Sequence, residues 1–127
     1  MKKILLIDDD LDDAELFKEA LSEADDTAFF EYYDDGKKAL QNLVLNPAQV
    51  PDIIFLDINM PSISGWDCLK ALKADKKLRK IPVIMYSTSN HKREMGIATE
   101  LGAADFIIKP HNYLELKEKL LKAINRY

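Results

Sequence analysis

The chain of 127 residues is poor in the features that mark secreted and membrane proteins. It has one cysteine, Cys68, which cannot form an internal disulfide bond, so a disulfide-stapled secreted domain is excluded. The apolar run at residues 4–7 meets three aspartates at once and is too short for a signal peptide. No run approaches the roughly 20 apolar residues of a transmembrane helix. We therefore expect a cytoplasmic protein without a membrane segment.

The chain also lacks an excess of basic residues. Lysine and arginine number 18 against 22 aspartate and glutamate residues, a net charge of −4, whereas direct binding to nucleic acid calls for a basic patch. Hydrophobic residues make up 47% and charged residues 31%, as in an ordinary globular chain. The length suits one domain, residues 1–127, with a core of its own.

Short apolar runs alternate with segments of helical periodicity along the whole chain. Strands are predicted at residues 4–7, 28–33, 53–56, 83–86 and 106–108. The helices between and after them place apolar residues three or four positions apart, as in Ala14, Phe17, Leu21 and Ala24; Ala39, Leu40, Leu43 and Val44; Leu69 and Leu72; and Leu116, Leu120 and Ile124, with Leu114 and Leu121 beside them. The fourth helix is expected from about His91 to Leu101, with Gly102 in a left-handed conformation after it.

Short strands that read as continuous apolar runs are buried on both faces of a parallel sheet. Their alternation with helices predicts an α/β fold, a doubly wound five-stranded parallel sheet with helices on both sides. Five such units favour the flavodoxin-like strand order 2-1-3-4-5, whose ligand crevice lies between strands one and three.

Polar side chains stand at the carboxyl ends of four of these strands. Asp8 and Asp9 end the first strand, Asp57 the third, Ser87 the fourth and Lys109 the fifth. A single aspartate after a buried strand can simply cap the next turn. The coincidence of all five residues at one edge of a parallel sheet instead indicates a ligand site.

The chemistry of these groups indicates what that ligand is. Three carboxylates in one crevice repel each other unless a cation lies among them, and oxygen ligands with room for water favour Mg²⁺. A hydroxyl from Ser87 and an ammonium from Lys109 would bind the oxygens of a phosphoryl group. Asp57 can then act as the nucleophile that forms an acyl phosphate.

Four segments carry a resemblance to a known family. "LLIDDD", "IIFLDINMPSISG", "IPVIMYSTS" and "FIIKP" resemble the signature blocks of response-regulator receiver domains, the CheY-like superfamily. The resemblance covers essentially the whole chain. It implies a two-component signalling protein that takes a phosphoryl group from a sensor histidine kinase or a histidine phosphotransfer protein. Such a protein is a phosphoacceptor switch that assists its own phosphorylation and dephosphorylation, and not an enzyme with a separate substrate.

The resemblance implies a role for each residue of the acidic cluster. Asp57 matches the phosphoacceptor, and Asp9 matches the acidic residue that binds Mg²⁺ directly. Asp8 matches the neighbour that acts on the metal through water. Asn59 stands where the backbone carbonyl is the third protein ligand.

The resemblance also implies how a signal leaves the site. Ser87 matches the switch hydroxyl, Phe106 the aromatic switch position, and Lys109 the phosphoryl-binding lysine, with Pro110 following in a peptide bond that is commonly cis in this family. Downstream targets or a second copy of the chain are expected to dock on the fourth helix, fifth strand and fifth helix.

The chain departs from the family pattern at three positions. Thr88 is bulkier than the usual alanine or glycine and is expected to crowd the approach to the phosphoryl group, and His111 stands where an apolar aromatic is common. Phe106 has no hydroxyl, so packing alone has to hold its ring.

The same aspartates allow three other hypotheses. A calcium loop at residues 8–19 would need glycine at its sixth position, where Asp13 stands. A haloacid-dehalogenase-type aspartyl phosphatase would use Asp8 and Asp10, but Asp12 occupies its threonine position and Asp57 stays unexplained. A flavodoxin-like cofactor binder would need a phosphate-binding loop after the first strand, which the chain lacks.

Overall fold

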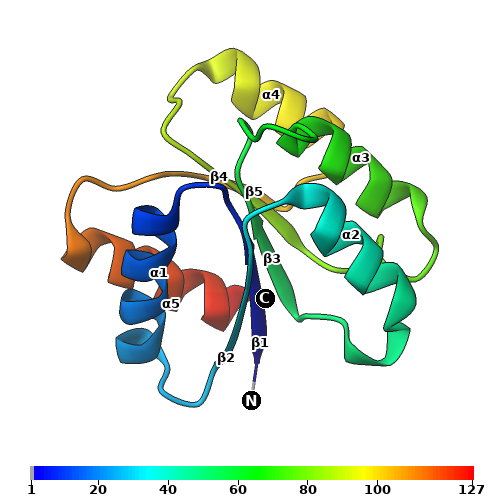
Figure 1. Ribbon diagram of the computed structural model, residues 1–127. Coiled ribbons are helices and arrows are strands. Elements are labelled where there is room, and N and C mark those ends of the chain that lie inside the picture. Colours follow the sequence, from blue (N-terminus) through cyan, green and yellow to red (C-terminus); the bar gives the residue numbers. More distant parts are fainter. Residues whose placement is uncertain (1) are drawn as a thin grey trace.

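The computed structural model describes residues 2–127 as one parallel sheet with helices on both faces (Figure 1). The strands are β1 (Lys3–Ile7), β2 (Phe29–Tyr33), β3 (Ile53–Leu56), β4 (Val83–Ser87) and β5 (Asp105–Ile108). The helices are α1 (Leu11–Ala24), α2 (Gly36–Leu45), α3 (Gly65–Ala74), α4 (Lys92–Glu100) and α5 (Tyr113–Arg126), with a short 3-10 helix, η1 (Pro47–Gln49). The strand order β2-β1-β3-β4-β5, all parallel, confirms the predicted topology.

Two hydrophobic layers cover the sheet. In Figure 1, α1 and α5 lie on one side and α2, α3 and α4 on the other. Alternate residues of β1 enter opposite layers: Ile4 and Leu6 face the α1–α5 layer, whereas Leu5 and Ile7 face the other. Because both faces of the central strands are covered, these strands read as unbroken apolar runs.

Polar residues fix the helix starts on the side of the sheet where the strands end. Asp10, Asp35, Ser64 and Asn112 are N-caps, and each side chain accepts a hydrogen bond from a backbone N–H two or three residues later. Gly102 follows α4 with φ at 94°, as predicted from its position. These caps fix the residue at which each of these helices begins, and so the length of the loop that precedes it.

Some apolar residues that the sequence placed on or beside the apolar helix faces are exposed. Val44 is 58% exposed because α2 buries Ala39 and Leu43, and the position after Leu43 is turned about 100° away from that face. Leu114 and Leu121 are likewise exposed, since α5 packs through Leu116, Leu120, Ala123 and Ile124. None of the helices in residues 2–127 is long and apolar enough to cross a membrane.

Candidate functional site

The predicted site residues meet at the carboxyl end of the sheet. Asp8 and Asp9 directly follow β1, Asp57 directly follows β3, and Ser87 is the last residue of β4. One carboxylate oxygen from each of Asp8, Asp9 and Asp57 lies within 4.8 Å of the others. The crevice between β1 and β3 therefore holds three carboxylates, as their positions in the sequence predicted.

Two of the three carboxylates are buried. Asp8 is fully buried and Asp57 is 7% exposed, whereas Asp9 faces solvent. Asp57 Oδ1 accepts a hydrogen bond from the N–H of Ile58, and Asp8 Oδ1 accepts one from the N–H of Asp10. These bonds satisfy one oxygen of each buried carboxylate and leave the second oxygen for another partner.

Burial changes the acidity of these groups. Burial first, and the nearby charge of Asp8 second, raise the pKa of Asp57 from 3.8 to about 7. The pKa of Asp8 is also raised, because its burial outweighs its interaction with Lys109. Together the two carboxylates resist ionisation even beside Lys109, and a further positive charge would favour it.

The donor set fits a hard divalent cation. Asp8, Asp9 and Asp57 offer closely spaced carboxylate oxygens without a sulfur or imidazole ligand, which is the chemistry that Mg²⁺ or Mn²⁺ prefers. Asn59, an exposed residue, lies two residues beyond Asp57 in the loop before α3, and its carbonyl stays a predicted ligand.

A tyrosine that the sequence analysis did not assign to the site holds its first loop. The hydroxyl of Tyr32, near the end of β2, donates a 2.6 Å hydrogen bond to the backbone carbonyl of Asp8. Burial and the charge of Asp8 raise the pKa of Tyr32 to about 12, so the phenol stays protonated as a donor at neutral pH. Tyr32 therefore anchors the loop that carries Asp8 and Asp9.

Lys109 is held by two carboxylates. Its Nζ lies 2.8 Å from Asp8 Oδ2 and 2.8 Å from Asp13 Oδ2, and 5.4 Å from the ring centre of Tyr86. Burial alone would lower the pKa of Lys109, but its close contacts with the carboxylates of Asp13 and Asp8 outweigh burial and raise that pKa. The sequence analysis missed Asp13 as a site residue. The signal was its place three residues after the N-cap Asp10, on a helix that starts beside the crevice.

The predicted switch residues lie on the two strands after β3, Ser87 on β4 and Phe106 on β5. Ser87 is 1% exposed, and its Oγ accepts a 3.2 Å hydrogen bond from the N–H of Ser89. Phe106 on β5 is half-buried and packs against the layer of α2, α3 and α4. Thr88, which directly follows Ser87, is exposed, as is His111.

The peptide bond between Lys109 and Pro110 is trans, whereas the family resemblance implied a cis bond. In residues 2–127 every peptide bond is trans, including this one. Cis and trans forms of an X–Pro bond differ by about 0.5–1 kcal/mol, so the surrounding contacts decide between them and a sequence motif does not.

Comparison with known proteins identifies the family. A family model described as response regulator receiver domain matches residues 4–121. The chain belongs to the response regulator receiver domain family. Its function is in two-component signal transduction, and the members of this family act as phosphoacceptor switches.

Individual relatives agree with this assignment. The chain is 32% identical over 124 residues to a chemotaxis protein CheY of Pseudomonas aeruginosa, covering 98% of this chain and 97% of that one. It is 32% identical over 118 residues to chemotaxis protein CheY1 of Helicobacter pylori, covering 93% of each chain. It is also 34% identical over 113 residues to the two-component response regulator ORR1 of Oryza sativa, and spans about half (49%) of that longer protein.

Solved structures show the same architecture. The phosphorylated cyanobacterial phytochrome response regulator RcpA superposes with a TM-score of 0.87 at 30% identity, over 96% of this chain and 90% of that chain. The Mn²⁺-bound form of response regulator Rcp1 superposes with a TM-score of 0.84 at 26% identity, over 96% and 91% of the two chains.

The structure also excludes two of the alternative hypotheses. Helix α1 begins at Leu11, inside the segment that a calcium loop would need. The Asp10 carboxylate, a required residue of the phosphatase motif, accepts the N–H of Asp13 as the N-cap of α1. The Asp10 carboxylate therefore caps α1 and does not serve as a residue of the crevice.

Proposed function

We propose that this receiver domain accepts a phosphoryl group on Asp57 from a phosphohistidine of a sensor histidine kinase or a histidine phosphotransfer protein. The observation that carries the proposal is the position of Asp57, a buried carboxylate beside Asp8, Asp9 and Lys109 at the carboxyl end of the sheet. An Asp57 oxygen attacks phosphorus, and the phosphorus–nitrogen bond breaks. Its electron pair stays on the imidazole, which takes up a proton, and Asp57 becomes an acyl phosphate.

The acidic cluster prepares Asp57 for this step. Asp9, Asp57 and the carbonyl of Asn59 would hold Mg²⁺ directly, and Asp8 would hold it through water. The metal would supply positive charge that ionises Asp57 and offsets the charge of the incoming phosphoryl group. Tyr32 keeps the Asp8–Asp9 loop in place through the Asp8 carbonyl.

Ser87 and Lys109 are the donors for the phosphoryl oxygens. A phosphoryl group adds about −1.5 to −2 charges and three acceptor oxygens. Ser87 would leave its bond to the Ser89 N–H and donate its hydroxyl instead. Since Ser87 on β4 pairs with Ile108 on β5, a shift of Ser87 reaches β5 and the ring of Phe106.

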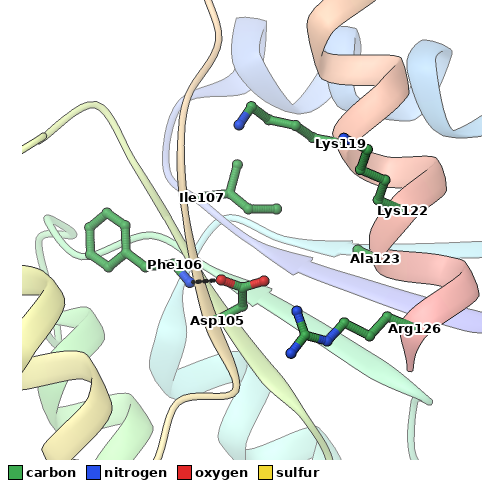
Figure 2. Close-up of a pocket in the computed structure, with 7 residues that line it drawn as sticks. All are labelled: Asp105, Phe106, Ile107, Lys119, Lys122, Ala123 and Arg126. Carbon is green, nitrogen blue, oxygen red and sulfur yellow. Dashed lines mark hydrogen bonds between the residues drawn. The ribbon is translucent and has the colours of Figure 1, made fainter.

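The signal would leave through the face formed by α4, β5 and α5. Figure 2 shows a pocket on this face, where Asp105 and Ile107 of β5 meet α5 and the ring of Phe106 points away to the other side of the strand. Lys119, Lys122 and Arg126 line the α5 side. A downstream protein target or a second copy of the chain would dock on this face of α4, β5 and α5, without contact to nucleic acid or membrane.

Chemical phosphorylation tests the proposal. With acetyl phosphate and Mg²⁺, mass spectrometry should find one added phosphoryl group that hydroxylamine removes. Asp57→Asn should stay unlabelled, because the amide cannot form an acyl phosphate. Asp67→Asn, a change at an exposed carboxylate in the first turn of α3, should label as the native protein does. Equal labelling rates in Asp57→Asn and the native protein would falsify the assignment.

Metal binding should stabilise the fold. At Mg²⁺ about 100-fold above its dissociation constant, linkage adds about 2.7 kcal/mol to the free energy of unfolding, so the melting temperature should rise. Asp9→Asn should lose most of this response, and its metal-free form should be more stable than the native one because one repulsive charge is gone. Thermal unfolding with and without Mg²⁺ measures both effects. An unchanged response in Asp9→Asn would remove Asp9 from the ligand set.

A further inference from the structure

The ammonium of Lys109 is shared unequally between its two carboxylate partners. Both Asp8 Oδ2 and Asp13 Oδ2 lie 2.8 Å from Nζ, but of the two contacts the one to Asp13 has hydrogen-bond geometry. Lys109 is 9% exposed, and 96 residues separate it from Asp13 in the chain. The main hydrogen bond of Lys109 in the resting protein is therefore to Asp13, which lies outside the predicted metal ligands.

The start of α1 explains why Asp13 is free to take this role. Asp10 is the N-cap, and its carboxylate accepts the N–H of Asp13 three residues later. In a reciprocal capping box the side chain at the position of Asp13 would reach back to the N–H of the N-cap. Here the Asp10 N–H is already bound by Asp8 Oδ1. The Asp13 carboxylate is left to reach Lys109.

The two partners of Lys109 differ in how easily they can release it. Asp8 is fully buried, so losing its positive partner would leave a buried charge without compensation. Asp13 is 32% exposed, and water can replace Lys109 there at little cost. Asp13 is thus the partner that Lys109 can leave.

We propose that Asp13 is a positioning residue that holds the Lys109 ammonium in the resting protein and competes for it with the phosphoryl group on Asp57. The inference rests on the proposed function, because it assigns regulation to the same site. Asp13 cancels part of the charge that Lys109 would otherwise present to phosphoryl oxygens. The strength of the Asp13–Lys109 interaction therefore sets how readily the phosphorylated state forms.

The affinity of beryllofluoride, which mimics a phosphoryl group on aspartate, tests this competition. The dissociation constant is measured by NMR titration of the full chain in saturating Mg²⁺. Asp13→Asn should bind beryllofluoride up to about fivefold more tightly than the native protein, the range expected for losing a partly exposed ion pair. Asp12→Asn is the matched control, because Asp12 carries the same charge in the same helix turn and is exposed. It should stay within about twofold of the native value.

Two further measurements separate competition from a general effect of charge or structure. In a Lys109→Gln background, adding Asp13→Asn should leave the beryllofluoride affinity unchanged, because the ammonium that it restrains is gone. The dissociation constant of Mg²⁺ alone should change by the same factor in Asp12→Asn and Asp13→Asn, since each removes one charge from the same turn.

The other outcomes overturn the inference. Weaker binding in Asp13→Asn would mean that Asp13 supports Lys109 in the bound state, and equal tightening in Asp12→Asn would mean that charge alone matters. A persistent effect of Asp13→Asn in the Lys109→Gln background would show that Asp13 acts elsewhere. If the native protein binds no beryllofluoride at all, the proposed function itself fails, whereas native binding with no Asp13 effect defeats the inference alone.

Discussion

The metal-free protein should lose stability as the pH rises from about 4 to about 7, and Asp57→Asn should remove most of that loss. The pKa of Asp57 is about 7 in the folded protein against 3.8 as its ordinary value, which applies to the unfolded chain. Between these two values the folded state keeps a proton that the unfolded state has released. The contribution of Asp57 to the free energy of unfolding is therefore most favourable below pH 3.8 and decreases until the pH has passed about 7.

The expected size of this effect is large for a single side chain. A shift of about three pKa units corresponds to at most roughly 4 kcal/mol at neutral pH. Asp8, whose pKa is raised as well, acts in the same direction and shares part of the effect. Asparagine at position 57 carries no charge at any pH, so its folded state avoids the cost of ionising this carboxyl.

Urea unfolding in the presence of a chelator, at pH 5 and at pH 8, measures the difference. The native protein should be clearly less stable at pH 8, while Asp57→Asn should show a much smaller decrease. Asp67→Asn should follow the native protein, since Asp67 is exposed. Saturating Mg²⁺ should also reduce the decrease, because the metal favours the ionised carboxylate. Parallel pH dependences for native protein and Asp57→Asn would show that Asp57 ionises without cost.

The fold could be predicted from the sequence because its strands are buried on both sides. β1 and β3 contribute consecutive apolar residues to both layers, so each reads as an unbroken run that ends where a carboxylate appears. Parallel strands bring their carboxyl ends to one edge, so the meeting of Asp8, Asp9 and Asp57 followed from the topology. These features depend on periodicity and connectivity, which a sequence carries directly.

Other features depend on side-chain directions that no periodicity encodes. The bond between Asp13 and Lys109 requires the third residue of α1 to point toward a residue that follows β5. The bond from Tyr32 to the Asp8 carbonyl requires the side chain of a β2 residue to point toward the loop that follows β1. The exposure of Val44 depends on how α2 is rotated about its axis. Each is fixed by tertiary packing, which becomes visible once the elements are placed.

One close contact ties the stability of the fold to the geometry of the site, and substituting Gly65 tests it. Gly65 begins α3 and donates a 2.7 Å hydrogen bond to the carbonyl of Ile58. A Cβ atom at position 65 would overlap the backbone oxygen of Asp57 and lie 2.7 Å from the Cα of Ile58. These obstacles are backbone atoms at the end of β3, so no side-chain rotation can make room. The first turn of α3 can therefore approach β3 this closely because residue 65 is glycine.

Gly65→Ala should destabilise the protein by about 3 kcal/mol, at the upper end of what overpacking costs. Because the backbone that must move carries Asp57, labelling by acetyl phosphate should also slow in the fraction that remains folded. Gly96→Ala is the matched control: it is also a helical glycine, and a Cβ there meets nothing within 4 Å. It should stabilise the protein by about 0.5–1 kcal/mol, the gain from replacing glycine by alanine inside a helix. Urea unfolding of the two variants should thus move in opposite directions from the native protein. A Gly65→Ala protein that unfolds at the native urea concentration and labels at the native rate would show that α3 can shift away from β3 without moving Asp57.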